Sequence, residues 1–302
     1  IIFGYFLNSH IILFYYLHRA LYKVGYFKKI NSTIQVKKYG KKFTIPVINE
    51  MGYYHLLKHE NWFPQILEKT LSLTKNAFID VGMNIGQTML SFYGLNRSNA
   101  YIGFEPNPAC IYYCHKLIAA NHFKNCSIFP VGLSYDNEIL TLKMDMDMAS
   151  GASLVKNFRT NESRYHTEIS VAVFPGDVVA EKNNLIPGVI KIDTEGAELE
   201  VLLGLKNSIK HYMPICIVEI LPVYDLNSEN GIFRKKRELE VVRFFTELHY
   251  NMYLINESDA TLFSLQEIPV HGDMSKTNYL FAHASKTEQL LALFPHHSMT
   301  KN

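Results

Sequence analysis

Residues between Asp80 and Gly86 combine an acid, two glycines and an asparagine in a pattern that suits a cofactor site. The segment reads FIDVGMNIGQT from Phe78 to Thr88: strand-like residues lead to Asp80, and Gly82, Asn84 and Gly86 precede an apolar, helix-like run. Glycines in such a turn let a ligand approach the backbone, and the following helix start offers free N–H groups. We expect the Asp80 carboxylate to point into this turn from the carboxyl end of the strand.

The acids select the kind of cofactor. A carboxylate beside the turn repels a pyrophosphate, and the G-x-N-x-G spacing differs from the G-x-G-x-x-G of dinucleotide-binding folds. S-adenosylmethionine has no phosphate, and an acid attracts its ammonium and sulfonium groups. Glu105 closes the next predicted strand, where a carboxylate can accept hydrogen bonds from both ribose hydroxyls. The alternative role for Glu105 is a helix N-terminal charge ahead of Pro106.

A second group of acids surrounds the segment VIKIDTEGAELE. Asp193 ends the fourth predicted strand and is the candidate base that removes a proton from the methyl acceptor. Glu195 and Glu198 share a face if a helix has begun there, and the alternative is a charge that complements the helix dipole. Lys191 lies in an apolar strand and needs a carboxylate partner, which Glu219 could supply while it lines the acceptor pocket.

The same acids leave a metal-dependent mechanism open. Asp193, Glu195 and Glu219 offer hard oxygen ligands for a divalent cation that would bridge the acceptor oxygen. We expect no metal, with Asp193, Glu195 and Glu219 as catalytic groups in their own right.

Alternating strand and helix patterns predict the scaffold that positions these residues. Strands such as PICIVEI are almost wholly apolar, which is typical of a parallel sheet covered by helices on both faces. The fold class is therefore α/β. We predict strands near 77–81, 100–105, 126–131, 189–193, 214–220, 251–256 and 278–283. We predict helices near 51–71, 85–94, 108–121, 197–210 and 235–248.

Three parts of the chain follow from this pattern. Residues 1–72 form an apolar, basic and helical extension, residues 73–284 the catalytic domain with inserted strands and a loop at 138–173, and residues 285–302 a tail. Basic residues without an acid follow an apolar run between Arg19 and Lys42. We expect the apolar run to pack on the domain, and a membrane-surface contact through residues 1–42 is the second interpretation.

Composition bounds the class of protein. With 302 residues, 48% of them hydrophobic, the chain can bury a large core, and a net charge of +2 gives no reason to expect a nucleic-acid partner. The four cysteines lack C-x-x-C spacing, and no cleavable signal peptide is visible. We expect a cytoplasmic protein, with membrane association as the alternative.

Four stretches together resemble one family. The segments FIDVGMNIGQT, GFEPNP, VGLSYDNEILTL and VIKIDTEGAELEVLLGL followed by IVEI look like the FkbM family of S-adenosylmethionine-dependent methyltransferases. The resemblance runs from about Ala77 to Phe281, and K-I-D-x-E-G-x-E is its most specific part. It implies a class I methyltransferase, Rossmann-like, with a seven-stranded, mostly parallel sheet whose last strand is antiparallel.

The resemblance also implies roles by position. Asp80, Gly82, Asn84, Gly86 and Glu105 would hold S-adenosyl-L-methionine, and Gly132 and Leu133 would border its adenine. The family usually has alanine where this chain has Gly132. The implied reaction is methyl transfer to a hydroxyl of a sugar, glycan or small natural product. The rival functions are a nicotinamide-dependent oxidoreductase and a binding module without turnover.

Overall fold

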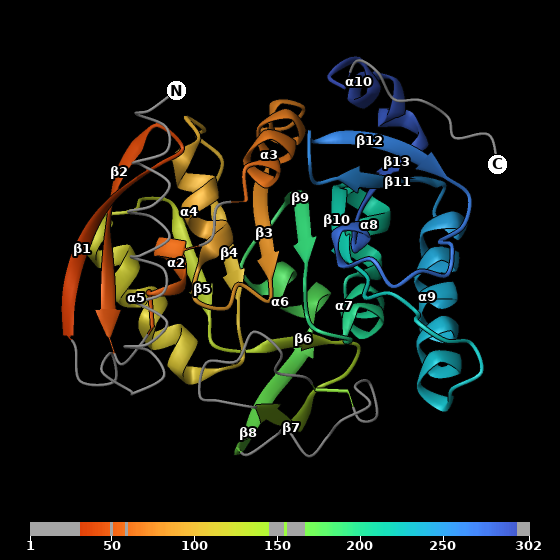
Figure 1. Ribbon diagram of the computed structural model, residues 1–302, viewed down its shortest axis with the longest axis horizontal. Coiled ribbons are helices and arrows are strands. Elements are labelled where there is room, and N and C mark those ends of the chain that lie inside the picture. The colour runs from red at the N-terminus through yellow and green to blue at the C-terminus, as the bar shows by residue number, and fades with distance from the viewer. Residues whose placement is uncertain (1–30, 49–50, 58–59, 145–153, 156–166, 295–302) are drawn as a thin grey trace, which may run out of the picture.

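A twisted eight-stranded sheet forms the centre of the molecule (Figure 1). The computed structural model describes residues 31–48, 51–57, 60–144, 154–155 and 167–294. The strands of the central sheet lie in the order β12-β11-β13-β10-β9-β3-β4-β5. Their bounds are β3 Ala77–Val81, β4 Tyr101–Phe104, β5 Cys126–Phe129, β9 Pro187–Ile192, β10 Ile215–Glu219, β11 Tyr250–Asn256, β12 Thr261–Leu265 and β13 Asn278–His283.

The pairing confirms a mostly parallel sheet with an antiparallel last strand. β10, β9, β3, β4 and β5 pair in parallel, whereas β13 runs antiparallel to both β10 and β11. The strand number differs from the expected seven, because β12 pairs with β11 at the sheet edge and adds an eighth strand. All seven predicted strands are present.

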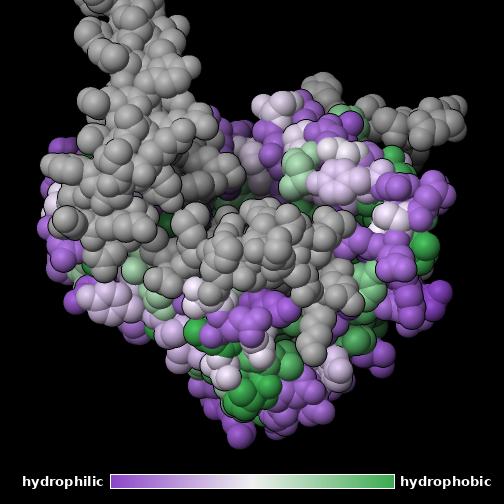
Figure 2. Space-filling model, turned by 60° about the horizontal axis from the view of Figure 1, so that its bottom comes forward, coloured by the Kyte–Doolittle hydropathy of each residue, from purple (hydrophilic) through white to green (hydrophobic). Residues whose placement is uncertain are grey.

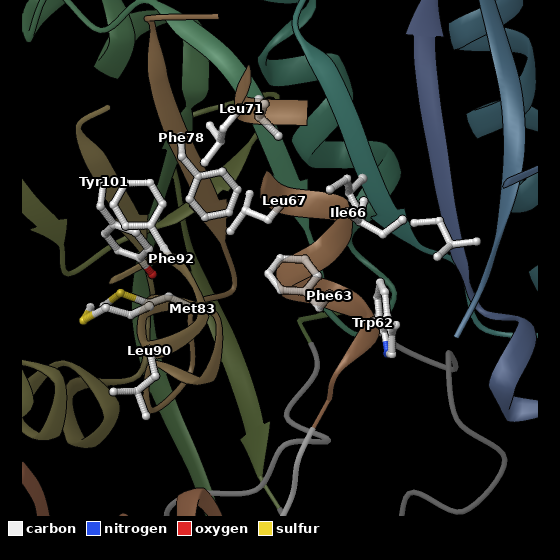
Figure 3. Packing of buried hydrophobic residues seen from close by; sticks show 14 of the residues in the cluster. Trp62, Phe63, Ile66, Leu67, Leu71, Phe78, Met83, Leu90, Phe92 and Tyr101 are labelled. Carbon is white, nitrogen blue, oxygen red and sulfur yellow. The ribbon is translucent and has the colours of Figure 1, made fainter. Parts of the chain in front are cut away.

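Helices cover both faces, as the apolar strands predicted. One face packs against α3 (Trp62–Ser72), α4 (Gln87–Gly94) and α5 (Pro108–Asn121), and the other against α6 (Gly176–Lys182), α7 (Glu198–Gly204), α8 (Lys206–Tyr212) and α9 (Glu229–Glu247). Successive strand residues alternate between the two cores: Phe78 joins the first and Ile79 the second. Figure 3 shows Phe63 and Leu67 of α3 packed toward Phe78.

The N-terminal extension is not helical throughout. Residues expected in a helical region form a hairpin of β1 (Asn31–Lys38) and β2 (Lys41–Ile48), and the helix predicted at 51–71 is reduced to α2 (Tyr54–Leu57) and α3. The alternating, β-branched runs and the Tyr39–Gly40 turn, where both residues have positive φ, favour the hairpin.

The hairpin is anchored on the catalytic domain. The Lys41 ammonium donates to the carbonyls of Tyr93 and Leu95 at the end of α4, each at 2.9 Å. The Tyr113 hydroxyl of α5 donates to the Pro46 carbonyl at 2.9 Å. The apolar run and half of the basic residues of the strip fall in residues 1–30, outside the described residues. No described helix is long and apolar enough to span a bilayer.

A small second sheet lies beside the carboxyl edge of the first (Figure 1). It has the order β6-β8-β7, with β6 Gly132–Ser134, β7 Glu138–Met144 and β8 Thr167–Pro175. The predicted antiparallel pair in the insertion is confirmed as β7 and β8, and β6 is an addition that pairs in parallel with β8. The helix predicted at 197–210 is interrupted between α7 and α8. α9 begins earlier than predicted because Ser228 caps it.

The segment assigned to a C-terminal tail includes structured residues. α10 (Thr287–Ala292) follows β13, and Leu290 and Phe294 are buried in the core that α3 also contacts. The Lys69 ammonium of α3 lies 4.1 Å from the centroid of the Phe294 ring. These contacts tie residues 287–294 to the domain.

Candidate active site

A cavity opens at the carboxyl edge of the sheet, between the ends of β3, β4, β9 and β10. The chain order reverses at β3, with β4 and β5 on one side and β9 and β10 on the other, and open α/β sheets bind ligands at such a point. Figure 2 turns this edge toward the reader, and the described part of this face carries both hydrophilic and hydrophobic side chains. The residues that line the cavity include Gly82, Asn84, Glu105, Gly132, Leu133, Asp193, Glu195 and Glu219.

The turn after β3 is fixed by the neighbouring strands. Gly82 (φ 81°) and Asn84 (φ 48°) lie in the left-handed region. The N–H groups of Gly82 and Met83 donate to the Phe104 carbonyl. A Cβ on Gly82 would lie 1.9 Å from the Asp193 carbonyl oxygen. Glycine is therefore required here by the close approach of the chain after β9, in addition to its positive φ.

Gly86 shapes the entry into α4 instead of touching the cavity. It has φ 85° at the N-cap of α4, and a Cβ there would lie 3.1 Å from Leu117 Cδ2 of α5. Gly86 is not among the residues that line the cavity. The expectation of a direct cofactor contact is therefore not supported, and its role is to let α5 pack against the turn.

The prediction for the Asp80 side chain was wrong. Asp80 lies inside β3, paired with Gly103 and Lys191, and its side chain is fully buried beneath the turn, outside the cavity lining. Its Oδ2 accepts from the Tyr101 hydroxyl at 2.5 Å, and its Oδ1 lies 3.9 Å from the Lys191 Nζ. Burial raises the pKa of Asp80 to about 6, although Lys191 and Tyr101 act to lower it. Asp80 is therefore a buried partner of Lys191.

Glu105 is held in the cavity wall by two backbone donors. Its Oε2 accepts from the Asn84 N–H and its Oε1 from the Asn107 N–H, both at 2.9 Å. Each oxygen keeps a second acceptor position. Burial raises the pKa of Glu105 to about 7, against the lowering effect of these two N–H groups. The cap of α5 is supplied by Asn107, whose side chain accepts from the Ala109 N–H, so Glu105 is not needed for that role.

Gly132 and Leu133 line the cavity from β6. A Cβ on Gly132 would lie 2.9 Å from Val173 Cγ1 of β8, which is too close for a side chain that cannot swing away. This contact gives a physical reason for glycine where the resembling family usually has alanine. Leu142 of β7 and Leu154 extend the same apolar wall.

Beside the glycine turn, an ion pair lies at the end of β9. The Lys191 ammonium donates to Asp193 Oδ2 at 2.8 Å. Although burial acts to lower it, the carboxylates of Asp193 and Asp80 raise the pKa of Lys191 above its ordinary value. Burial and then the Asp193 carboxylate raise the pKa of Glu219 far above its ordinary range. Thr277 donates to Glu219 Oε1 at 3.3 Å. The raised pKa favours the protonated form of Glu219 at neutral pH, whereas Asp193 forms the ion pair with Lys191.

Glu195 and Glu198 do not share a helix face, because α7 begins only at Glu198. Glu195 lies in the preceding turn with φ 52° and lines the cavity. The Glu198 carboxylate turns back and accepts from the Thr194 and Gly196 N–H groups. The condition for a common helix face is therefore not met, and only Glu195 of this pair lines the cavity.

One carboxylate oxygen each from Asp193, Glu195 and Glu219 can be chosen so that all three lie within 4.8 Å of one another. The spacing suits a divalent cation, so the structure keeps the metal-dependent alternative open. The sequence pattern missed Glu60, Gln87 and Thr88, which also line the cavity. Gln87 and Thr88 could have been found as the first residues of the helix after the glycine turn. Glu60 lies in the extension and carries no motif.

The sheet order, the antiparallel β13 and a cavity at the switch point define a class I methyltransferase fold. The chain belongs to the FkbM methyltransferase family, because residues 80–258, more than half of its length, match the methyltransferase FkbM domain. The hairpin β1–β2 and α3 lie outside this match.

Similar proteins include one that is named for its substrate. The chain is 25% identical over 189 residues to the hexuronic acid methyltransferase AglP of Haloferax volcanii, over 62% of this chain and 72% of that protein. The FkbM methyltransferase structure from Methylobacillus flagellatus matches with a TM-score of 0.47 and 15% identity, over 76% of this chain and about half (49%) of that one. The SAH-bound methyltransferase PaMTH1 of Podospora anserina matches with a TM-score of 0.39 and 10% identity, over 88% and 95% of the two chains.

Proposed function

We propose that this protein transfers a methyl group from S-adenosyl-L-methionine to a hydroxyl oxygen of a sugar, a glycan or a small natural product. The observation that carries the proposal is the arrangement of two acidic centres in one cavity. Glu105 lies at the end of β4, and the Asp193–Glu219 pair lies after β9 and β10. The first suits a ribose diol and the second suits an acceptor hydroxyl.

The residues present fit the cofactor. Two backbone N–H groups hold the Glu105 carboxylate, so its remaining acceptor positions can take two ribose hydroxyls. Leu133, Leu142 and Leu154 provide an apolar wall for a flat base. Bound there, the cofactor would supply a methyl group on a sulfonium, with the neutral thioether of S-adenosylhomocysteine as the leaving group.

The chain's own contribution to the reaction is positioning and proton transfer. Asp193 is oriented by the Lys191 ammonium on one side and by protonated Glu219 on the other. A hydroxyl bound against the Asp193 carboxylate would lose its proton to this carboxylate as the oxygen attacks. Holding the acceptor in line provides most of the remaining acceleration.

The proposal of a sugar hydroxyl as the acceptor is supported by the relative AglP and by the charges of the cavity lining. AglP acts on a hexuronic acid, which supports a sugar acceptor for this family member. Among the described residues of the cavity lining, Lys191 is the single Lys or Arg, and it is already paired with Asp193. A neutral hydroxyl therefore suits this end of the cavity better than a carboxylate.

Two measurements test the function. Calorimetry should show binding of S-adenosylhomocysteine and no binding of NAD, and the opposite result would favour the oxidoreductase. Labelled S-adenosylmethionine should then transfer its methyl group to members of a panel of methyl pyranosides and methyl uronosides. Cofactor binding with no transfer to any glycan or small-molecule hydroxyl would favour a binding module.

The same assay decides between a base and a metal. Inactivation by EDTA with recovery in Mg²⁺ or Mn²⁺ would assign Asp193, Glu195 and Glu219 as ligands. Unchanged activity in EDTA is the result expected from the proposed mechanism.

Glu105 should make cofactor affinity depend on pH. Because its pKa is raised to about 7, the free protein loses the carboxylate as the pH falls through that value, and affinity for S-adenosylhomocysteine should fall with it. Glu105→Gln should weaken binding at pH 8 by about 1.5–3 kcal/mol and remove this dependence. Calorimetry from pH 6 to 8 measures both effects, and Glu138→Gln, at an exposed position on β7, is the control. An unchanged dissociation constant would contradict the ribose contact.

Glu219 should act in its protonated form. Its raised pKa keeps the proton on Glu219 at neutral pH, so Glu219→Gln, which retains a donor toward Asp193, should preserve most of kcat. Glu219→Ala should lower kcat by about tenfold or more, since Asp193 loses a charge-assisted hydrogen bond. Equal losses in both variants would show that the ionised form of Glu219 is required.

A further inference from the structure

The turn between β9 and α7 holds a non-glycine residue in a costly conformation. Glu195 has φ 52°, in the left-handed region that long side chains rarely adopt. Such a residue persists only where the surroundings fix it, and these positions concentrate at functional sites. The Glu195 side chain lines the cavity beside Asp193 and Glu219.

Glu198 holds the turn by accepting hydrogen bonds from the turn's backbone N–H groups. One oxygen, Oε1, accepts from the Thr194 N–H at 3.2 Å, the Thr194 hydroxyl at 3.1 Å and the Gly196 N–H at 3.0 Å. These donors lie on both sides of Glu195 in the sequence. Glu198 is 8% exposed, so water competes little for the same oxygen.

Arg237 of α9 holds the same turn through a backbone carbonyl group. Its guanidinium donates to the Gly196 carbonyl at 2.7 Å and also pairs with Glu200 of α7. The guanidinium is planar and presents a fixed fork of donors, which makes this two-way contact directional. Side chains from α7 and from the distant helix α9 therefore contact the same turn.

We infer that Glu198 and Arg237 form a turn clamp that positions Glu195 in the acceptor end of the cavity. Held there, the Glu195 carboxylate accepts a hydrogen bond from a second hydroxyl of the acceptor, next to the hydroxyl that faces Asp193. Glu198 and Arg237 are positioning residues, and Glu195 is an acceptor-binding residue that selects for adjacent hydroxyls. The inference rests on the proposed function for the role of Glu195, while the clamp itself stands on the hydrogen bonds.

The clamp is tested first without an acceptor. Amide hydrogen exchange by NMR at Thr194 and Gly196 should be about tenfold faster or more in both Arg237→Ala and Glu198→Ala. Glu198→Ala removes the acceptor of both N–H groups, and Arg237→Ala removes the charged donor that holds the Gly196 carbonyl and with it the turn. Arg243→Ala, at an exposed position on the same helix, is the matched control. Affinity for S-adenosylhomocysteine should stay within about twofold, since Glu105 is untouched. Unchanged exchange in both variants would overturn the clamp.

The role of Glu195 is then tested with the methyl pyranosides that the native enzyme methylates. Arg237→Ala, Glu198→Ala and Glu195→Gln should raise the acceptor KM by about tenfold. Glu198→Gln, which keeps an acceptor oxygen in the turn, and Arg237→Lys, which keeps the charge, should restore part of the loss. Single-deoxy pyranosides lacking the hydroxyl next to the methylated one should show little difference between native enzyme and Glu195→Gln.

The two tests separate the possible failures. Faster exchange with an unchanged acceptor KM would reject the acceptor-binding role of Glu195 and retain the clamp. A loss of thermal stability and of cofactor affinity together, in the conservative variants as well, would show that the contacts serve only the fold. Absence of methyl transfer by the native enzyme to every pyranoside would reject the proposed function, and the exchange result would still decide the clamp.

Discussion

Asp193→Asn is expected to lower kcat by about 10²–10⁴-fold while leaving the affinity for S-adenosylhomocysteine within a few-fold of native. Asp193 lies after β9 and lines the cavity on the side opposite Glu105, so the cofactor's ribose contact is undisturbed. Asparagine has nearly the same shape, but it cannot take the acceptor's proton, and Lys191 loses an ionised partner at 2.8 Å.

The pH profile distinguishes a proton acceptor from a structural residue. Activity of the native enzyme should rise with pH through one ionisation and then level off, because the base must be ionised before the acceptor can lose its proton. Asp193→Asn should lack this rising limb. Asp136→Asn, at an exposed position outside the cavity lining, is the control. Near-native turnover of Asp193→Asn would contradict the role of Asp193 as a base. The acceleration would then come from positioning of the acceptor and the methyl group alone.

Lys191→Met is expected to destabilise the fold by about 3–5 kcal/mol at neutral pH, because it leaves the Asp80 carboxylate buried without its cation. Asp80 is fully buried, with Lys191 Nζ 3.9 Å from Oδ1, and no described group donates a hydrogen bond to that oxygen. Methionine has a similar volume, so a cavity contributes little. Denaturant unfolding measures the loss.

The double variant separates charge from packing. Asp80→Asn combined with Lys191→Met should recover most of the stability, since an uncharged pair no longer requires burial of an uncompensated charge. The loss of unfolding free energy in Lys191→Met alone should also become smaller as the pH falls. Burial holds the folded pKa of Asp80, about 6 in the native protein, above its unfolded value, so ionisation costs stability as the pH rises through the folded pKa. A deficit independent of pH and not rescued by Asp80→Asn would assign the loss to packing.

The sequence was sufficient where a pattern is local and repeated. Apolar strand runs predicted the parallel sheet, and each predicted strand is present within a few residues. The spacing of acids at strand ends placed Glu105, Asp193 and Glu219 together, because the carboxyl ends of parallel strands meet at one edge of the sheet. The glycine turn was equally readable, since positive φ at Gly82 requires that residue.

Only the tertiary structure decided where individual side chains point and which of them share a proton or a charge. Asp80 was expected in the cofactor site, but its side chain is buried inside the sheet beside Lys191, where it is a counter-ion. The hairpin β1–β2 is stabilised by its docking on α4 and α5, contacts between segments distant in the chain. The clamp on Glu195 depends on Arg237, which sequence spacing cannot bring to the turn, because side-chain direction and long-range pairing are fixed by packing.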